Sequence, residues 1–229
     1  MILSRGRRFL LIHPPKTAGT SVMAALEARA IKDDILLGDT PKAKRRRHRV
    51  GDVKSAGRLW KHSRLSDLPG LLLPGELETL RVVCLARNPW DRVVSYYYWL
   101  QEQRFAHPAV ERSQTRSFSA FLAHPDTQSE LRRSNCVDYV RDGSGEVRCD
   151  LFLRFESLAE DMKALENLLD IKLPTLVHLN ASARPKAYQM QYSDTDRSLL
   201  ADLAAPDIDH FGYTFTTSAK PLQTSHKKN

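Results

Sequence analysis

A nine-residue loop carries side chains and a chain position that suit it to holding an anion. It reads HPPKTAGTS over residues 13–21 and follows the apolar run Phe9–Ile12, with helical periodicity after it up to Ala30. Backbone N–H groups at a helix N-terminus point into the crevice beyond the strand, and the helix dipole favours negative charge there. Lys16 adds a full positive charge. The order strand, loop, helix predicts a phosphate-binding loop, although a capped turn with a surface lysine has the same local pattern.

A second junction of the same kind follows the apolar run Leu80–Ala86. Asn88 is a good N-cap, Pro89 suits the first helical position, and Asp91 falls in the first turn, where a carboxylate favours the helix dipole. Helical spacing of apolar residues continues to Leu100. The chain therefore predicts two strand-to-helix junctions with polar residues at each.

The first loop differs from the loop of mononucleotide-binding ATPases and GTPases. That loop has the pattern GxxxxGK[ST], in which two glycines enclose four residues and the lysine comes near the end. Here there is one glycine, Gly19, and Lys16 precedes it. The pattern therefore argues against a nucleoside triphosphatase of that type.

Both junctions resemble those of sulfotransferases that use 3'-phosphoadenosine 5'-phosphosulfate (PAPS). The family pattern P-K-[TS]-[AG]-[GS]-[TS]-[TS] is matched by residues 15–21, and R-[ND]-P-x-D-R-x-x-S is matched by residues 87–95. Residues 154–156 and 179–182, with Tyr188, Asp209 and residues 211–213, are similar to the carbohydrate, Golgi-type and bacterial branch. The matches run from residue 9 to about 215 and are poorest over 31–79.

The resemblance implies a binding site for each end of PAPS and of its product PAP. Arg87 and Ser95 would hold the 3'-phosphate, although Arg87 could instead form a structural ion pair with Asp91 or Glu156. Arg184 and Lys186 would close over the 3'-phosphate and the adenine. The 5'-phosphosulfate would lie in the first loop, on Pro15, Lys16, Thr17, Ala18, Gly19, Thr20 and Ser21.

Two residues are expected to take part in the transfer itself. Lys16 would stabilise the charge that develops on the oxygen left on the 5'-phosphate, an effect of about 3–4 kcal/mol for one donor. His62 occupies a position where members of the branch often carry a histidine, and a histidine suits proton removal at neutral pH. His62 could also be a solvated surface residue. His13 is the reserve candidate for the base, and His48 lies in a charged run and is discounted.

The remaining segments predict an α/β fold, P-loop-like and three-layered, with a central mainly parallel sheet flanked by helices. Residues 147–155 read as a strand that pairs with 137–140 through an Asp142-Gly143 turn. Ser157 with Glu160 forms a possible capping box for the next helix. Ser193 repeats this capping pattern before a helix over 194–204.

Length and apolar content limit the domain organisation. With 229 residues, 41% of them hydrophobic, the chain can bury one sizeable core. We expect one domain over residues 1–215 and a flexible tail over 216–229. No apolar stretch approaches the length of a transmembrane helix, and the apolar run near the start is too short for a secretory signal. We therefore expect Phe9–Ile12 to be the first core strand and expect no targeting segment.

The three cysteines are Cys84, Cys136 and Cys149. They lack the spacing of a zinc site, no metal is expected, and an odd number argues against a disulfide framework. A reducing, cytoplasmic environment is the simplest interpretation. A bridge between Cys136 and Cys149 across the predicted hairpin remains open, and Cys84 is expected to be a small core residue.

The formal charge of +8 is concentrated in one segment, 41–49, which contains six basic residues. Such a run is typical of a solvated or disordered loop, and an anion-attracting patch is the alternative.

The sequence as a whole predicts a sulfotransferase that moves a sulfuryl group from PAPS to a hydroxylated acceptor by in-line displacement. A saccharide is the favoured acceptor. One alternative is a nucleic-acid or polyanion-binding protein that uses the basic run, and another is a family member that binds PAP without catalysis. No specific nucleic acid is expected as a partner, and the oligomeric state is not specified.

Overall fold

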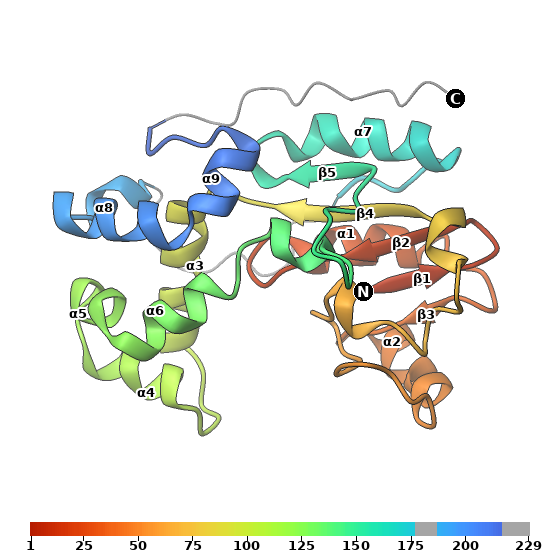
Figure 1. Ribbon diagram of the computed structural model, residues 1–229, viewed down its shortest axis with the longest axis horizontal. Coiled ribbons are helices and arrows are strands. Elements are labelled where there is room, and N and C mark those ends of the chain that lie inside the picture. The colour runs from red at the N-terminus through yellow and green to blue at the C-terminus, as the bar shows by residue number, and fades with distance from the viewer. Residues whose placement is uncertain (177–186, 217–229) are drawn as a thin grey trace.

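The computed structural model describes residues 1–176 and 187–216 (Figure 1). Within them a five-stranded sheet has the order β3-β1-β2-β4-β5. Strand β1 is antiparallel to both of its neighbours, whereas β2, β4 and β5 are parallel to one another. The strands are β1 (Ile2–Ser4), β2 (Phe9–Ile12), β3 (Ile35–Leu36), β4 (Arg81–Ala86) and β5 (Leu151–Arg154). The expectation of an α/β fold with a mainly parallel sheet is confirmed. Strand β1 precedes Phe9–Ile12, so the prediction that 9–12 is the first strand was wrong.

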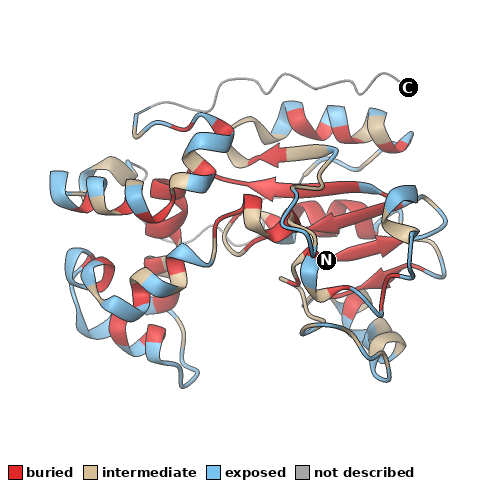
Figure 2. Cartoon of the chain, viewed as in Figure 1, coloured by how far each residue is buried: buried red, intermediate tan, exposed pale blue. Residues whose placement is uncertain are grey.

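Both faces of the sheet are covered, because successive residues of a strand point to opposite faces and those of β2 and β4 are apolar except for Arg81. On one face, Leu11 and Val83 pack with residues of α1 (Gly19–Glu27) and α7 (Leu158–Leu169). On the other face, Leu10 and Cys84 pack against two 3₁₀ helices, η2 (Leu65–Asp67) and η4 (Val137–Val140). Figure 2 shows the central strands buried along most of their length.

A block of helices lies beyond the carboxyl ends of the parallel strands, at the left of Figure 1. Its apolar core includes Val94, Phe121 and Phe211 and continues into the end of β4 at Ala86. This packing fixes the first helix of the block against the sheet edge where ligands bind in open α/β folds. The helices are α3 (Pro89–Gln101), α4 (Pro108–Thr115), α5 (Phe118–Ala123), α6 (Pro125–Arg132), α8 (Asp194–Leu203) and α9 (Ala205–Phe211), with η6 (Tyr188–Gln191) alongside.

Local capping signals were correct at two helices and wrong at a third. The Asn88 side chain accepts a hydrogen bond from the Trp90 N–H, as predicted for the start of α3. Ser193 caps α8 in a capping box with Asp196. Ser157 makes no cap for α7, because its hydroxyl donates to the Asp161 carboxylate over 3.0 Å.

The predicted hairpin between 137–140 and 147–155 is confined to one antiparallel bridge, between Arg141 and Val147, with the Arg148 N–H donating to the Val140 carbonyl over 2.8 Å, and its predicted strands were wrong. Residues 137–140 form η4, and β5 begins only at Leu151. The Asp207 carboxylate, in α9, accepts hydrogen bonds from the N–H groups of Cys136 and Val137 over 2.7 and 2.9 Å. This long-range contact fixes the start of η4. All three cysteines are free, so the bridge between Cys136 and Cys149 does not form.

The basic segment is ordered rather than a disordered loop. It forms α2 (Pro41–Arg46) and the 3₁₀ helix η1 (Arg47–Val50), with Thr40 accepting from the Ala43 N–H as N-cap. Arg46 donates to the Ile31 carbonyl over 2.8 Å, and Arg49 donates to the Asp34 carbonyl over 3.1 Å. The other elements in region 31–79, where the motif matches are poorest, are β3, η2 and η3 (Glu76–Thr79).

Across residues 1–176 and 187–216, none of the helices has the length and apolar character needed to cross a membrane. The same residues contain no cluster of three or more His, Cys, Asp or Glu side chains arranged to hold a metal ion. Of the predicted flexible tail, only residue 216 is described.

Candidate anion-binding and transfer site

The two predicted junctions lie side by side at one edge of the sheet. Strands β2 and β4 are parallel neighbours, and their last paired residues are Ile12 and Cys84. Strand β4 continues two residues beyond this pair, to Ala86, so the loop that follows β2 lies beside the end of β4 and Arg87. The Arg87 guanidinium spans the gap, because Nη1 donates to the Lys16 carbonyl oxygen over 2.9 Å. The sequence predicted both junctions, and the sheet order brings them together.

The first loop has an unusual backbone conformation. Lys16 and Ala18 have φ of 67° and 66°, in the left-handed region that residues other than glycine rarely adopt. Ala18 is also the N-cap of α1. A turn in which left-handed residues precede a right-handed helix points successive N–H groups into one concavity and so forms an anion nest. Strain of about 1–3 kcal/mol at such a residue is commonly found where a ligand binds. Sequence reasoning missed this feature, since neither residue is glycine.

Close packing explains the single glycine of the loop. A Cβ atom on Gly19 would lie 2.2 Å from Nδ1 of His13, which is far inside van der Waals contact. Thr17 is fully buried, and its hydroxyl donates to the Pro14 carbonyl over 2.8 Å. The hydroxyl of Thr17 therefore stabilises the loop. His13, the reserve base, is a buried packing partner, and burial lowers its pKa well below the ordinary value.

The Lys16 ammonium lies at the helical side of the loop. Nζ is 5.4 Å from the centroid of the Trp99 ring, near the end of α3. The side chain borders a cavity of about 110 Å³ between the loop, α3 and α6. Sequence reasoning gave no role to the α6 residues of this cavity, because no motif marks them. The cavity is lined by Pro15, Lys16, Arg92, Val93, Tyr96, Glu130, Leu131 and Ser134.

Arg87 forms the buried ion pair that the sequence allowed as an alternative. Its Nε and Nη2 donate to one carboxylate oxygen of Asp91 over 2.9 and 2.7 Å, and its guanidinium lies 3.9 Å from the Phe155 ring centroid. Ser95 is one helical turn beyond Asp91 on the same face of α3 and is 3% exposed. The pair holds Arg87 against the face of α3 that also carries Ser95, and the contact of both residues with a 3'-phosphate stays a prediction.

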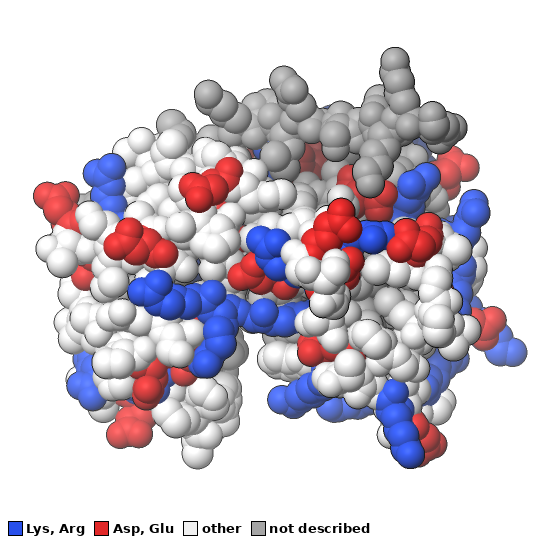
Figure 3. Space-filling model, viewed as in Figure 1, with Lys and Arg blue, Asp and Glu red and all other residues white. Residues whose placement is uncertain are grey.

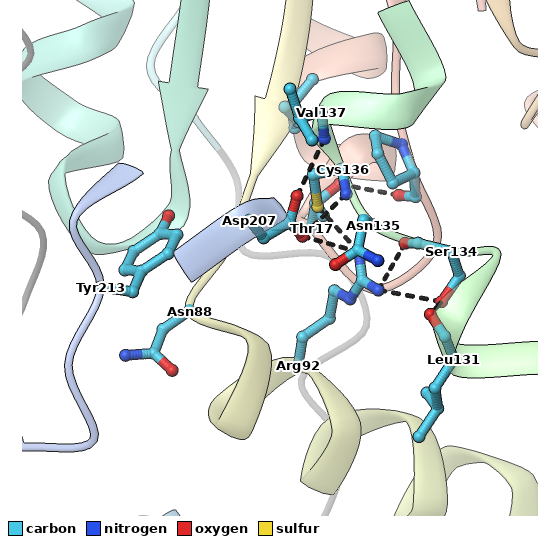
Figure 4. A network of polar contacts seen from close by, with 12 residues as sticks. Thr17, Asn88, Arg92, Leu131, Ser134, Asn135, Cys136, Val137, Asp207 and Tyr213 are labelled. Atoms are coloured by element: carbon cyan, nitrogen blue, oxygen red, sulfur yellow. Dashed lines mark hydrogen bonds and ion pairs between the residues drawn. The ribbon is translucent and has the colours of Figure 1, made fainter. Parts of the chain in front are cut away.

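The second arginine of the motif, Arg92, belongs to a buried network that Figure 4 shows from close by. Its guanidinium donates to the Cys136 sulfur over 2.7 Å and to the Ser134 carbonyl over 2.6 Å. The Asp207 carboxylate lies 3.9 Å away. Burial raises the pKa of the Cys136 thiol, so this sulfur is a neutral acceptor. The network connects α3 to η4 and α9, and Arg92 therefore positions the helix that carries Ser95.

His62 lies against the loop, as the candidate base requires. Its Nδ1 is 2.9 Å from the His13 carbonyl oxygen, and the two rings meet edge to face at 4.8 Å. Because a carbonyl only accepts hydrogen bonds, Nδ1 carries the proton and Nε2 has the free lone pair. Burial, with a smaller effect of the nearby Lys61 charge, lowers the pKa of His62 to about 4. The imidazole is therefore neutral at pH 7 and able to accept a proton.

The other predicted site residues are placed as follows. Ser21 is buried at the first turn of α1, and Thr20 is exposed beside it. Arg184 and Lys186 fall in 177–186, outside the described residues. The neighbouring tyrosines 96–98 mainly pack among the helices, with Tyr97 buried against Phe118.

Comparisons with known proteins find similarity to solved structures. No family model matches the chain, and no curated protein matches it. Among solved structures, the chain is similar to mouse sulfotransferase SULT7A1 complexed with PAP, at 15% sequence identity and a TM-score of 0.40. The match covers 89% of this chain and 64% of that one, so the chain spans somewhat less than two thirds of its length. At this identity and TM-score the likeness carries no inference about the function of this chain.

Proposed function

We propose that this protein transfers a sulfuryl group from PAPS to a hydroxyl group of a saccharide. The observation that carries the proposal is the adjacency of the two junctions, with Arg87 hydrogen bonded to the carbonyl of Lys16 over 2.9 Å. A donor with phosphate groups at both ends of one adenosine needs two neighbouring anion sites. The sequence motifs assign one site to each junction.

The nest formed by 16–19 suits the 5'-phosphosulfate. Its N–H groups sit at the N-terminus of α1, where the helix dipole adds positive potential. Arg87 and Ser95 would hold the 3'-phosphate through charge-assisted and neutral hydrogen bonds. Such a bond to a charged group contributes about 1.5–3 kcal/mol. PAPS supplies an activated sulfuryl group, and the chain supplies the two sites that orient it.

The chemistry requires one proton acceptor and one positive charge. The acceptor hydroxyl oxygen forms a bond to sulfur as the bond from sulfur to the 5'-phosphate oxygen breaks. The hydroxyl proton passes to Nε2 of His62, and the bonding electron pair stays on the phosphate oxygen of PAP. Lys16 would neutralise the charge that grows on that oxygen. Lys16 belongs to the loop 13–21 and His62 contacts the same loop at the His13 carbonyl, which supports the proposal that both act at this loop.

The carbohydrate branch is the finer part of this proposal. It is supported by the resemblance of residues 154–156, Tyr188 and 211–213 to that branch. Two of these segments are joined in the structure, since Tyr213 donates to the Glu156 carboxylate over 3.2 Å, and Tyr188 donates to the carbonyl of Phe215, two residues beyond the third segment, over 2.6 Å. A role in nucleic-acid binding alone is less well supported, because Arg46 and Arg49 of the basic run are hydrogen bonded to backbone carbonyls.

Ligand binding tests the proposal most directly. Isothermal titration and thermal shift should show that PAP stabilises the protein, by about 2.7 kcal/mol at a hundredfold excess over Kd, while ATP and NAD have little effect. A panel of neutral and acidic oligosaccharides then reports turnover of PAPS. Equal stabilisation by PAP, ATP and NAD would remove the assignment of a donor site. Tight PAP binding with no transfer to any hydroxylated acceptor would support the non-catalytic alternative.

A further inference from the structure

A second cavity, of about 230 Å³, lies beside the His62 segment and outside the donor site. Its walls come from the end of β3, from α2 and η1, and from the stretch 58–61. None of these residues has a part in the transfer described above. The lining consists of Leu36, Leu37, Gly38, Asp39, Ala43, Arg47, Arg58, Leu59, Trp60 and Lys61.

The charges on this cavity are mostly positive. Lys61 pairs with Asp39 over 2.5 Å. Within the described parts of the chain, no carboxylate pairs with Arg47 or Arg58, and both residues are exposed. Figure 3 shows Lys and Arg side chains gathered on the lower right of the visible face, around α2. The cavity therefore presents three cations against one carboxylate.

The neighbouring arginines make Arg47 distinctive within the basic run. Arg46 and Arg49 reach back to the carbonyls of Ile31 and Asp34 and so fasten α2 and η1 to the body. Arg47, one residue along from Arg46, borders the cavity instead. In the basic run, Arg46 and Arg49 therefore hold the segment against the body of the protein, whereas Arg47 faces the cavity.

Trp60 connects the cavity to the reaction centre. The Arg58 guanidinium carbon lies 4.8 Å from the Trp60 ring centroid, and the Trp60 and His62 rings meet edge to face at 5.0 Å. A ligand seated on Trp60 would therefore extend toward the proposed base. Flat apolar ring faces pack against the C–H faces of sugars, and a guanidinium binds carboxylates in a forked geometry.

We propose that this cavity binds an acidic sugar unit of the acceptor, flanking the sugar whose hydroxyl is sulfated. Arg47 and Arg58 would hold its carboxylate or sulfate ester, and Trp60 with Leu59 would contact its ring. The assignment of an acceptor rests on the proposed function, whereas binding at the cavity does not. A single aromatic ring beside a cavity of about 230 Å³ favours one sugar unit over a nucleic acid strand, which needs a longer basic track with successive stacking rings.

Direct binding tests this assignment independently of transfer. Isothermal titration in low salt compares a hyaluronan tetrasaccharide, which carries carboxylates, with neutral chitotetraose of the same length. The wild-type protein should bind the first and bind the second at least tenfold more weakly. Arg58→Ala and Arg47→Ala should each weaken hyaluronan binding about tenfold. Arg45→Ala is the matched control, because it removes the same charge from an exposed residue of α2 that does not line the cavity.

The outcomes separate this inference from the proposed function. Equal binding of both oligosaccharides, or equal effects of Arg45→Ala and Arg58→Ala, would overturn the acidic-sugar site even where PAP binds normally. Loss of PAP binding with Arg58-dependent hyaluronan binding intact would overturn the donor site instead. A dT10 oligonucleotide that binds more tightly than hyaluronan, and loses affinity with Arg58→Ala, would assign the cavity to nucleic acid. Trp60→Leu serves as a second variant that keeps the apolar wall and removes the ring.

Discussion

Nη1 of Arg87 donates to the carbonyl oxygen of Lys16 over 2.9 Å, so a side chain from the end of β4 holds the backbone of the loop after β2. The same guanidinium is oriented by Asp91 from the first turn of α3. Arg87 therefore links the two halves of the candidate donor site, and a substitution in either half is expected to affect the geometry of the other.

Arg87→Ala should weaken PAP binding and destabilise the fold together. Removal of one partner of a buried ion pair leaves Asp91 with an uncompensated charge, at a cost of about 3–5 kcal/mol. Titration calorimetry with PAP and chemical denaturation measure the two effects. Arg81→Ala is the control, because Arg81 begins the strand that ends just before Arg87, but is exposed and pairs with Asp150 only over 3.5 Å. Unchanged PAP affinity in a folded Arg87→Ala protein would displace the 3'-phosphate site.

Lys16→Ala should reduce turnover of PAPS by about 10²–10³-fold while changing PAP affinity much less. The charge that Lys16 stabilises grows in the transition state, so its loss acts mainly on kcat. Lys16→Arg keeps the positive charge and should recover part of the rate. Steady-state kinetics with a saccharide acceptor measure both variants. Wild-type turnover by the alanine variant would remove the role assigned to this lysine.

His62→Gln should lower turnover by about 10²–10⁴-fold and leave PAP binding intact. A base must be unprotonated, so wild-type kcat/KM should rise with pH through the free-enzyme pKa of about 4 and be level near neutrality. The pH profile of the glutamine variant should lack this acidic limb. Near-normal activity of the variant would assign proton removal to another group.

The same histidine makes stability depend on pH. Between its folded pKa of about 4 and its unfolded value of 6.5, the unfolded chain binds the proton more strongly. Stability should therefore fall as pH decreases through this window, by up to about 1.4 kcal/mol per pH unit for one proton. Denaturation at pH 7 and pH 5 measures the change. His62→Gln should reduce it, and the remainder should include contributions from His13, His210 and the buried Met1 amine, whose pKa values burial lowers in the same direction. An identical pH dependence in variant and wild type would contradict the burial of His62.

Gly19→Ala should disturb the loop, because its Cβ would lie 2.2 Å from the His13 ring. Overpacking at a buried site costs about 1–3 kcal/mol, and a displaced loop should also lose PAP affinity. Ala18→Gly is the informative counterpart. Since Ala18 has φ of 66°, glycine there relieves strain of about 1–2 kcal/mol, and the protein should be as stable as wild type or more so. A destabilised Ala18→Gly protein with a normal Gly19→Ala protein would show that the loop has another conformation.

The amino-acid sequence by itself determined the features that depend on neighbouring residues. The runs Phe9–Ile12 and Leu80–Ala86 contain the strands β2 and β4. Asn88 and Ser193 cap their helices, because each side chain accepts a hydrogen bond from an N–H group in the first turn of the helix that follows it. The alternation of strands with helices, which predicts a mainly parallel sheet, could also be read from the order of these local signals. The two motif segments could therefore be located before their geometry was known.

Only the tertiary structure decided the features that depend on contacts between distant residues. Residues 137–140 became a 3₁₀ helix because Asp207, about 70 residues later, takes up the N–H groups at its start. His62 became a half-buried neutral group through a contact with His13, 49 residues away. The basic run was ordered by carbonyls of 31–34. Burial and long-range hydrogen bonds outweigh local propensity at these positions, because the free energy of an unpaired buried polar group exceeds the small preferences that a short segment encodes.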